Sequence, residues 1–153
     1  MDLRLYHNSH EFYYRSSFGA VPSGSRLILR LRASGSDAQN CRARIRLWQI
    51  NVGESFVPMS YEDGIFTGIV TIPPKGCLLW YYFIIDDGHR TFYYGNNYDR
   101  LGGEGAKYPD VPPAYQVTVY DKDAHTPDWF KHAIVYQIFP DRFRHGTHTS
   151  GRL

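Results

Sequence analysis

The segment Arg26-Leu27-Ile28-Leu29-Arg30-Leu31-Arg32 decides the fold class of this chain. In an extended chain its three leucines lie on one face and its arginines on the other, which is the pattern of a strand with one buried face. The segment Cys41–Trp48 repeats the alternation, with Cys41, Ala43, Ile45 and Leu47 facing inward and Arg42, Arg44, Arg46 and Trp48 facing outward. Both segments therefore predict half-buried β-strands.

Other short apolar segments, separated by turn residues, continue this pattern. Leu78–Ile85 is nearly all apolar and is predicted to be a central strand covered on both faces, and Asp86-Asp87-Gly88-His89 then forms a hairpin turn. Further strands are predicted over Leu3–Tyr6, Ile65–Ile72, Arg90–Tyr94 and Tyr115–Tyr120. Seven or eight short strands at this spacing predict an all-β fold, an antiparallel Ig-like β-sandwich.

The pattern changes after the last of these strands. Residues 1–123 are predicted to form the sandwich, with the Gly-, Asn- and Pro-rich segment Gly95–Pro113 as a long ordered loop. Residues 124–153 are predicted to form a separate linker, in which Thr126 and Pro127 start a short helical turn over 127–132. Ile134–Phe143 then predicts one short buried strand that runs into a polar turn.

Composition excludes several classes of partner. The formal net charge of +2 is too small to indicate nucleic-acid binding, and no segment approaches membrane-spanning length. The first residues lack the apolar core of a secretory leader, so a soluble cytoplasmic protein is expected. Cys41 and Cys77 have no metal-ligand spacing, and either two buried thiols or one disulfide fits them. No metal and no cofactor is predicted.

The segment Thr126–Phe143, TPDWFKHAIVYQIFPDRF, resembles the beginning of the catalytic (β/α)8 barrel of α-amylase-family glycoside hydrolases, in the neopullulanase, cyclomaltodextrinase and pullulanase branch. The earlier segments LILRLRAS, WYYFIIDDG and YYGNN resemble the N-terminal, carbohydrate-binding-module-like sandwich of those enzymes. The structural motif at the start of the barrel falls on Tyr136, Gln137, Pro140, Asp141, Arg142 and Phe143.

This resemblance implies a parent enzyme that hydrolyses α-1,4 or α-1,6 bonds of maltodextrin, pullulan or cyclodextrin with retention. Retention requires two carboxyl groups about 5 Å apart, and the family's catalytic motifs do not occur in this sequence. A barrel takes about 250 residues, so we expect an inactive fragment that lacks most of its barrel. The partners implied are an α-glucan, the missing barrel and a second copy in a homodimer.

Within that resemblance, the sandwich is expected to bind glucan, to brace the barrel or to take part in dimerisation. The alternative is a free-standing sandwich that binds carbohydrate or protein. In isolation, Ile134–Phe143 is expected to pair with a sandwich edge, to pair with a second copy, or to be disordered. Residues 144–151 contain no carboxylate, so no calcium site is expected there.

Aromatic side chains are the candidates for sugar binding, because a flat ring stacks on the apolar C–H face of a sugar. The candidates are Trp48, Trp80, Tyr82, Tyr93, Tyr94 and Tyr98. An outward Trp48 is either a glucan platform or a residue covered by a loop or by the barrel. Asp141 is expected to order a turn rather than act as an acid. His132, His145 and His148 are residues of a type that can bind zinc, but a frayed, partly disordered tail is the favoured interpretation of this segment.

Overall fold

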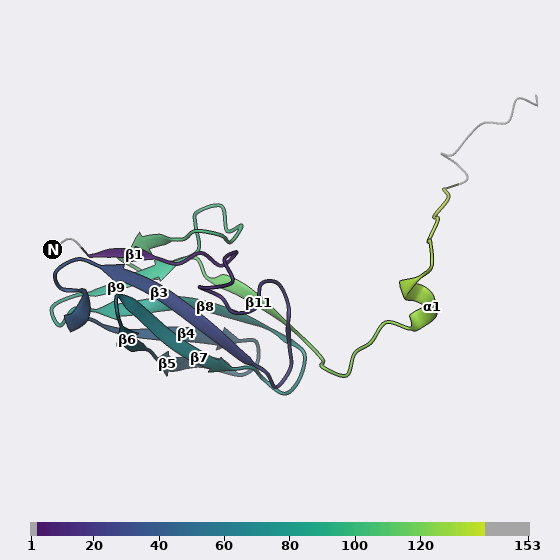
Figure 1. Cartoon of the computed structure of the whole chain (residues 1–153), viewed down its shortest axis with the longest axis horizontal. Helices are drawn as coiled ribbons and strands as arrows, with labels where there is room; N and C mark the ends of the chain where they lie inside the picture. The colour runs from purple at the N-terminus through teal and green to yellow at the C-terminus, as the bar shows by residue number, and fades with distance from the viewer. Residues whose placement is uncertain (1–2, 140–153) are drawn as a thin grey trace, which may run out of the picture. The chain divides into compact units, whose positions relative to one another are not determined.

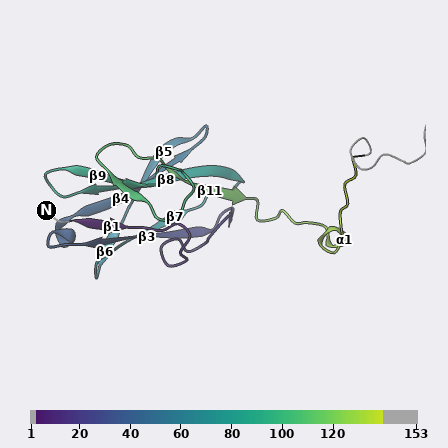
Figure 2. The ribbon, with the colours of Figure 1, turned by 90° about the horizontal axis from the view of Figure 1, so that it is seen from above.

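The computed structural model describes residues 3–139, and the chain divides into two units, Met1–Asp123 and Ala124–Leu153. In the first unit, strands form two sheets that lie in two layers (Figures 1 and 2). The four-stranded sheet is antiparallel, in the order β1-β3-β7-β6. Its strands are β1 (Arg4–Tyr6), β3 (Arg26–Ser34), β6 (Ser60–Glu62) and β7 (Ile65–Thr71).

The seven-stranded sheet is built around the long strand β8 (Cys77–Asp86). One edge of β8 pairs with β4 over most of its length, and the other edge pairs first with β11 and then with β9. The remaining strands are β2 (Val21–Pro22), β4 (Arg42–Gln49), β5 (Gly53–Pro58), β9 (Thr91–Gly95), β10 (Ala106–Tyr108) and β11 (Tyr115–Tyr120). The short 3-10 helix η1 (Ala38–Asn40) precedes β4.

The core lies between the two sheets and consists of the inward-facing residues that the alternation predicted. Leu27, Leu29 and Leu31 of β3 face Ile45 of β4 and the alternate residues of β8 within one cluster of buried side chains. This burial is the main favourable term in folding, and it confirms the all-β sandwich. The prediction of a fully antiparallel sandwich is wrong for the seven-stranded sheet. That sheet is mixed, because β2 pairs with β11 in parallel.

The two cysteines are free thiols and lie at opposite ends of β8. Cys77 is the first residue of β8, whereas Cys41 precedes Arg42, which pairs with Asp86 at the other end. At about 3.3 Å per residue, this separation is about 30 Å. A disulfide within one molecule is therefore excluded, since its Cα atoms must lie within about 7 Å.

The second unit contains helix α1 (Asp128–Lys131). The predicted cap at Thr126 is wrong: Pro127 is the N-cap and no side chain closes the first turn, because the helix begins one residue later than predicted. The described part of the predicted terminal strand, Ile134–Phe139, forms no strand, and Ile134 is 95% exposed. A buried strand requires a neighbour, and none pairs with this segment among residues 3–139. No helix in this described range is long and apolar enough to cross a membrane.

Candidate functional site

The outer face of the seven-stranded sheet carries a pair of tryptophans. Trp48 of β4 and Trp80 of β8 are register partners, and their ring centroids lie 5.1 Å apart at an angle of 55°. Both side chains are half-buried, although they point away from the core. Sequence alternation predicted this outward direction for Trp48, and the structure confirms it. On β8, Trp80 shares its face with Tyr82, whereas the fully buried Tyr81 and Phe83 face the core.

Next to the tryptophan pair on the same face, Arg46 of β4 covers Tyr82 of β8. The Arg46 guanidinium lies 5.2 Å from the centroid of the Tyr82 ring, and its Nε donates to a carboxylate oxygen of Glu54. Tyr93 packs edge-on against Tyr82 with centroids 6.0 Å apart. Tyr82 is consequently only 6% exposed, and burial raises the pKa of its hydroxyl. The Tyr82 ring therefore lies under Arg46 and offers little surface to a ligand.

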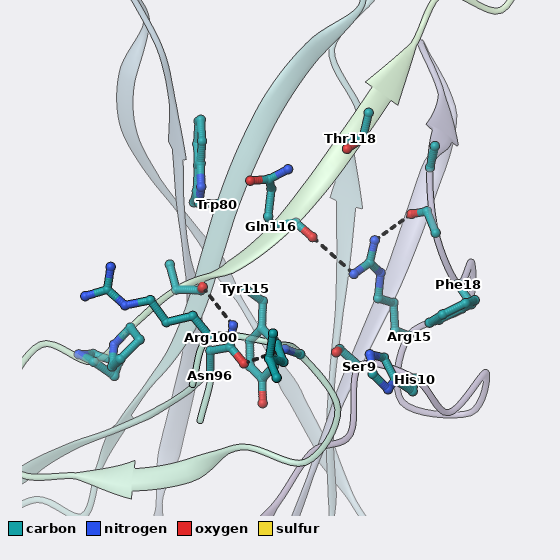
Figure 3. Close-up of a pocket in the computed structure, with 17 residues that line it drawn as sticks. Ser9, His10, Arg15, Phe18, Trp80, Asn96, Arg100, Tyr115, Gln116 and Thr118 are labelled. Carbon is teal, nitrogen blue, oxygen red and sulfur yellow. Dashed lines mark hydrogen bonds between the residues drawn. The ribbon is translucent and has the colours of Figure 1, made fainter. Parts of the chain in front are cut away.

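A pocket of about 660 Å³ opens beside Trp80, over strand β11 (Figure 3). Its floor is formed by Gln116 and Thr118, the outward residues of β11, and Phe18 lies on the side opposite Trp80. This volume is typical of pockets that hold a small molecule. The pocket combines aromatic rings with an amide and a hydroxyl, which are the groups that sugars engage.

Arg15 fixes the wall of the pocket that contains Phe18. Its guanidinium donates three hydrogen bonds to backbone carbonyl oxygens: Nε to Ser17 at 3.1 Å, Nη1 to Gln116 at 3.2 Å and Nη2 to Gly19 at 2.7 Å. Arg15 is 6% exposed, so these bonds form away from water, where losing one is costly. The segment after Arg15 is thereby tied to β11 and enters β2 in a fixed position.

The loop after β9 forms another side of the pocket. Asn96 is buried, and its side-chain oxygen accepts hydrogen bonds from the backbone N–H groups of Asn97 and Gly102, both at 3.0 Å. Its amide nitrogen donates to the Ala114 carbonyl at 3.3 Å. This network holds the loop in a conformation that places Arg100 and Leu101 at the pocket, as predicted for an ordered loop.

The chain is similar in sequence to known proteins. No protein-family model matches the chain. It is 40% identical over 153 residues to an amylopullulanase of Thermoanaerobacterium thermosulfurigenes, a match that covers 93% of this chain and 8% of the relative. It is 40% identical to an amylopullulanase of Thermoanaerobacterium saccharolyticum (93% of this chain, 12% of the relative) and 38% identical to one of Thermoanaerobacter thermohydrosulfuricus (99% and 10%).

The chain is homologous to a segment of amylopullulanases. It spans about a tenth of the length of these curated relatives. The predicted relationship to α-amylase-family glycoside hydrolases is therefore confirmed, and it rests on a match that includes the sandwich and not only residues 126–143.

The other candidate aromatics lie in different surroundings. Tyr94 is 2% exposed and belongs to the core, where its hydroxyl accepts from the His7 N–H and donates to the His7 carbonyl, both at 3.1 Å. Burial raises its pKa to about 12, and its ring is not available to a ligand. Tyr98 is 80% exposed on the loop after β9, against Tyr108, and does not line the pocket beside Trp80.

The barrel-start residues fall in the second unit. Tyr136 is exposed, as is Gln137, and Pro140, Asp141, Arg142 and Phe143 lie outside the described residues. The same holds for His145, His148 and the segment 144–151. Within residues 3–139, no three His, Cys, Asp or Glu side chains come together as a metal site.

Sequence reasoning missed Phe18, Arg15 and Gln116. Gln116 could have been found, because alternation along Tyr115–Tyr120 places it on the outer face. Phe18 and Arg15 carry no such signal. They reach the site through the parallel pairing of β2 with β11, between segments almost a hundred residues apart in sequence.

Proposed function

We propose that this chain is a non-catalytic module of an enzyme that acts on α-glucans, and that it binds glucan on the outer face of its seven-stranded sheet. The observation that carries the proposal is the Trp48–Trp80 pair, two half-buried rings held side by side next to a polar pocket. Homology to amylopullulanases supports the class of ligand, since the name of these relatives refers to amylose-type and pullulan substrates.

The geometry suits a sugar chain in three respects. The two indole rings offer apolar surface that can stack on successive glucose rings. Strand pairing fixes both rings on a rigid sheet, so little side-chain freedom is lost when a ligand binds. Amide, hydroxyl and guanidinium groups stand at the edge of this surface, where they can bond the hydroxyls of the sugar.

The test is a titration of the purified chain with maltoheptaose, followed by tryptophan fluorescence and calorimetry. Trp48→Ala and Trp80→Ala are each expected to weaken binding about 30-fold, the cost of losing a central aromatic anchor worth about 2 kcal/mol. Trp129→Ala is the matched control, because Trp129 lies on α1 and is 72% exposed. It is expected to leave the affinity unchanged.

Two results would contradict glucan binding at this face. One is wild-type protein that does not bind maltoheptaose, and this would favour the alternative in which the tryptophans pack against another domain or a second copy. The other is binding that survives both substitutions. A separate incubation with pullulan and maltoheptaose is expected to release no reducing sugar, and activity of the pure chain would overturn the non-catalytic assignment.

A further inference from the structure

The tryptophan pair and the pocket lie on one straight row across the sheet. Trp48 pairs with Trp80, and Trp80 pairs with Gln116 on β11. Gln116 forms the floor of the pocket, and Phe18, which precedes β2, lines the pocket on the side opposite Trp80. With strands about 4.8 Å apart, the row of Trp48, Trp80 and Gln116 is about 10 Å long, which suits a short stretch of a sugar chain.

The two ends of this row are different. At Trp48 the surface continues towards Glu54 on the neighbouring strand β5. At the other end, Phe18 lies across the pocket from Trp80 (Figure 3). The segment that carries Phe18 is held by Arg15 and by a bond from the Ile28 N–H to the Ser16 hydroxyl at 2.8 Å. This wall is therefore preformed, and a chain that follows the row from Trp48 ends against it.

The polar groups at this end can bond a ligand rich in hydroxyl groups. The Gln116 amide both donates and accepts, the Thr118 hydroxyl does the same, and Arg100 adds donors on another side. The described lining contains no carboxylate. A terminal glucose residue carries a free hydroxyl at the position where an internal residue carries a glycosidic bond, so a polar pocket can distinguish the two.

We propose that this pocket binds the terminal glucose residue of an α-glucan chain, while the residues that follow stack on Trp80 and Trp48. The inference rests on the proposed function and adds a substrate preference to it: the module recognises chain ends rather than continuous stretches of glucan. Trp80 belongs to both parts, because it lines the pocket and contacts Trp48.

The test compares maltoheptaose with β-cyclodextrin, which has the same number of glucose residues closed into a ring without ends. Wild-type protein is expected to bind the linear sugar about tenfold more tightly, the equivalent of one well-placed hydrogen bond. Gln116→Ala and Phe18→Ala are each expected to remove this preference by weakening the linear sugar alone. Trp48→Ala is expected to weaken both sugars, and Tyr120→Ala, an outward residue of β11 outside the pocket, neither.

The outcomes separate this inference from the function on which it rests. Equal affinity of the wild-type protein for both sugars overturns the chain-end pocket and leaves glucan binding intact. A preference for the linear sugar that persists in both Gln116→Ala and Phe18→Ala also overturns it. Failure to bind either sugar overturns both proposals together.

Discussion

His7 gives the sharpest test of the structure, because a titratable ring is fully buried in the middle of the sandwich. Its Nδ1 lies 2.7 Å from the Arg30 carbonyl oxygen and its Nε2 lies 3.0 Å from the Tyr81 hydroxyl. A carbonyl only accepts, so Nδ1 carries the proton and the Tyr81 hydroxyl donates to Nε2. Tyr14, Phe83 and Tyr115 pack against the ring, which is neutral in the folded protein with both nitrogens satisfied.

Burial lowers the pKa of His7 from 6.5 to about 4, and the nearby Arg15 cation acts in the same direction, while the bond to Arg30 opposes it. As pH falls below 6.5, the unfolded chain binds a proton that the folded protein does not accept until about pH 4. The free energy of unfolding therefore falls through this window and levels off below it. The shift corresponds to about 3 kcal/mol lost between pH 7 and pH 4.

Urea denaturation at several pH values between 7 and 4 measures this effect. The wild-type protein is expected to lose about 3 kcal/mol more than His7→Gln over this range, although His7→Gln is less stable at pH 7. His125→Gln, at an exposed histidine, is the matched control and is expected to follow the wild type. Equal slopes for the wild type and His7→Gln, or an NMR titration of the His7 ring with a midpoint near 6.5, would refute the reasoning.

Three further predictions concern packing, a close backbone approach and thiol reactivity. Phe83→Ala is expected to lower the free energy of unfolding in urea by about 3–5 kcal/mol, because the ring is fully buried. Gly105→Ala is expected to lower the melting temperature far more than Gly19→Ala: the new Cβ would overlap the Gly95 carbonyl oxygen, whereas Gly19, with φ 84°, has open space and adds only about 1–2 kcal/mol of backbone strain. An equal fall in melting temperature for the two variants would contradict the close approach of Gly105 to the Gly95 carbonyl oxygen. Cys77 is expected to react with a thiol reagent faster than Cys41, since Cys41 is buried and Cys77 only half-buried; the opposite order would contradict the placement of β8.

The long strands of this fold could be predicted from the sequence because each carries its own signal. Alternation assigned the inward and outward residues of β3 and β4, and Tyr115–Tyr120 matches β11 at both ends. The short strands β2, β5, β6 and β10 were missed. They lie towards the sheet margins. β2, β6 and β10 have only two or three residues, too few to show a period, and β5 has six residues but no buried side chain, so no alternation marks it.

The candidate site was only partly predictable, for a physical reason that differs between residues. Alternation fixes on which face of a strand a side chain lies, so the outward direction of Trp48 was predicted. Along the nearly all-apolar β8 it does not tell which face is outer, so the direction of Trp80 was not predicted. Alternation also does not tell which face of β9 is inner, and Tyr94 is the residue of the Tyr93–Tyr94 pair that lies inside. The pocket wall at Phe18 depends on pairing between distant segments, which a local pattern does not contain.

The arginine-rich faces explain why the tryptophan pair is distinct from the other aromatic residues of the surface. The Arg44 guanidinium lies 5.1 Å from the centroid of the Phe56 ring, and that of Arg46 lies 5.2 Å from the centroid of the Tyr82 ring. A guanidinium over a ring satisfies its face and shields it from water. Trp48 and Trp80 instead lie against each other, with a polar pocket on one side. A ligand that binds the outer face therefore gains more by covering this pair than by covering Tyr82, because the Tyr82 ring already lies under Arg46 and is only 6% exposed.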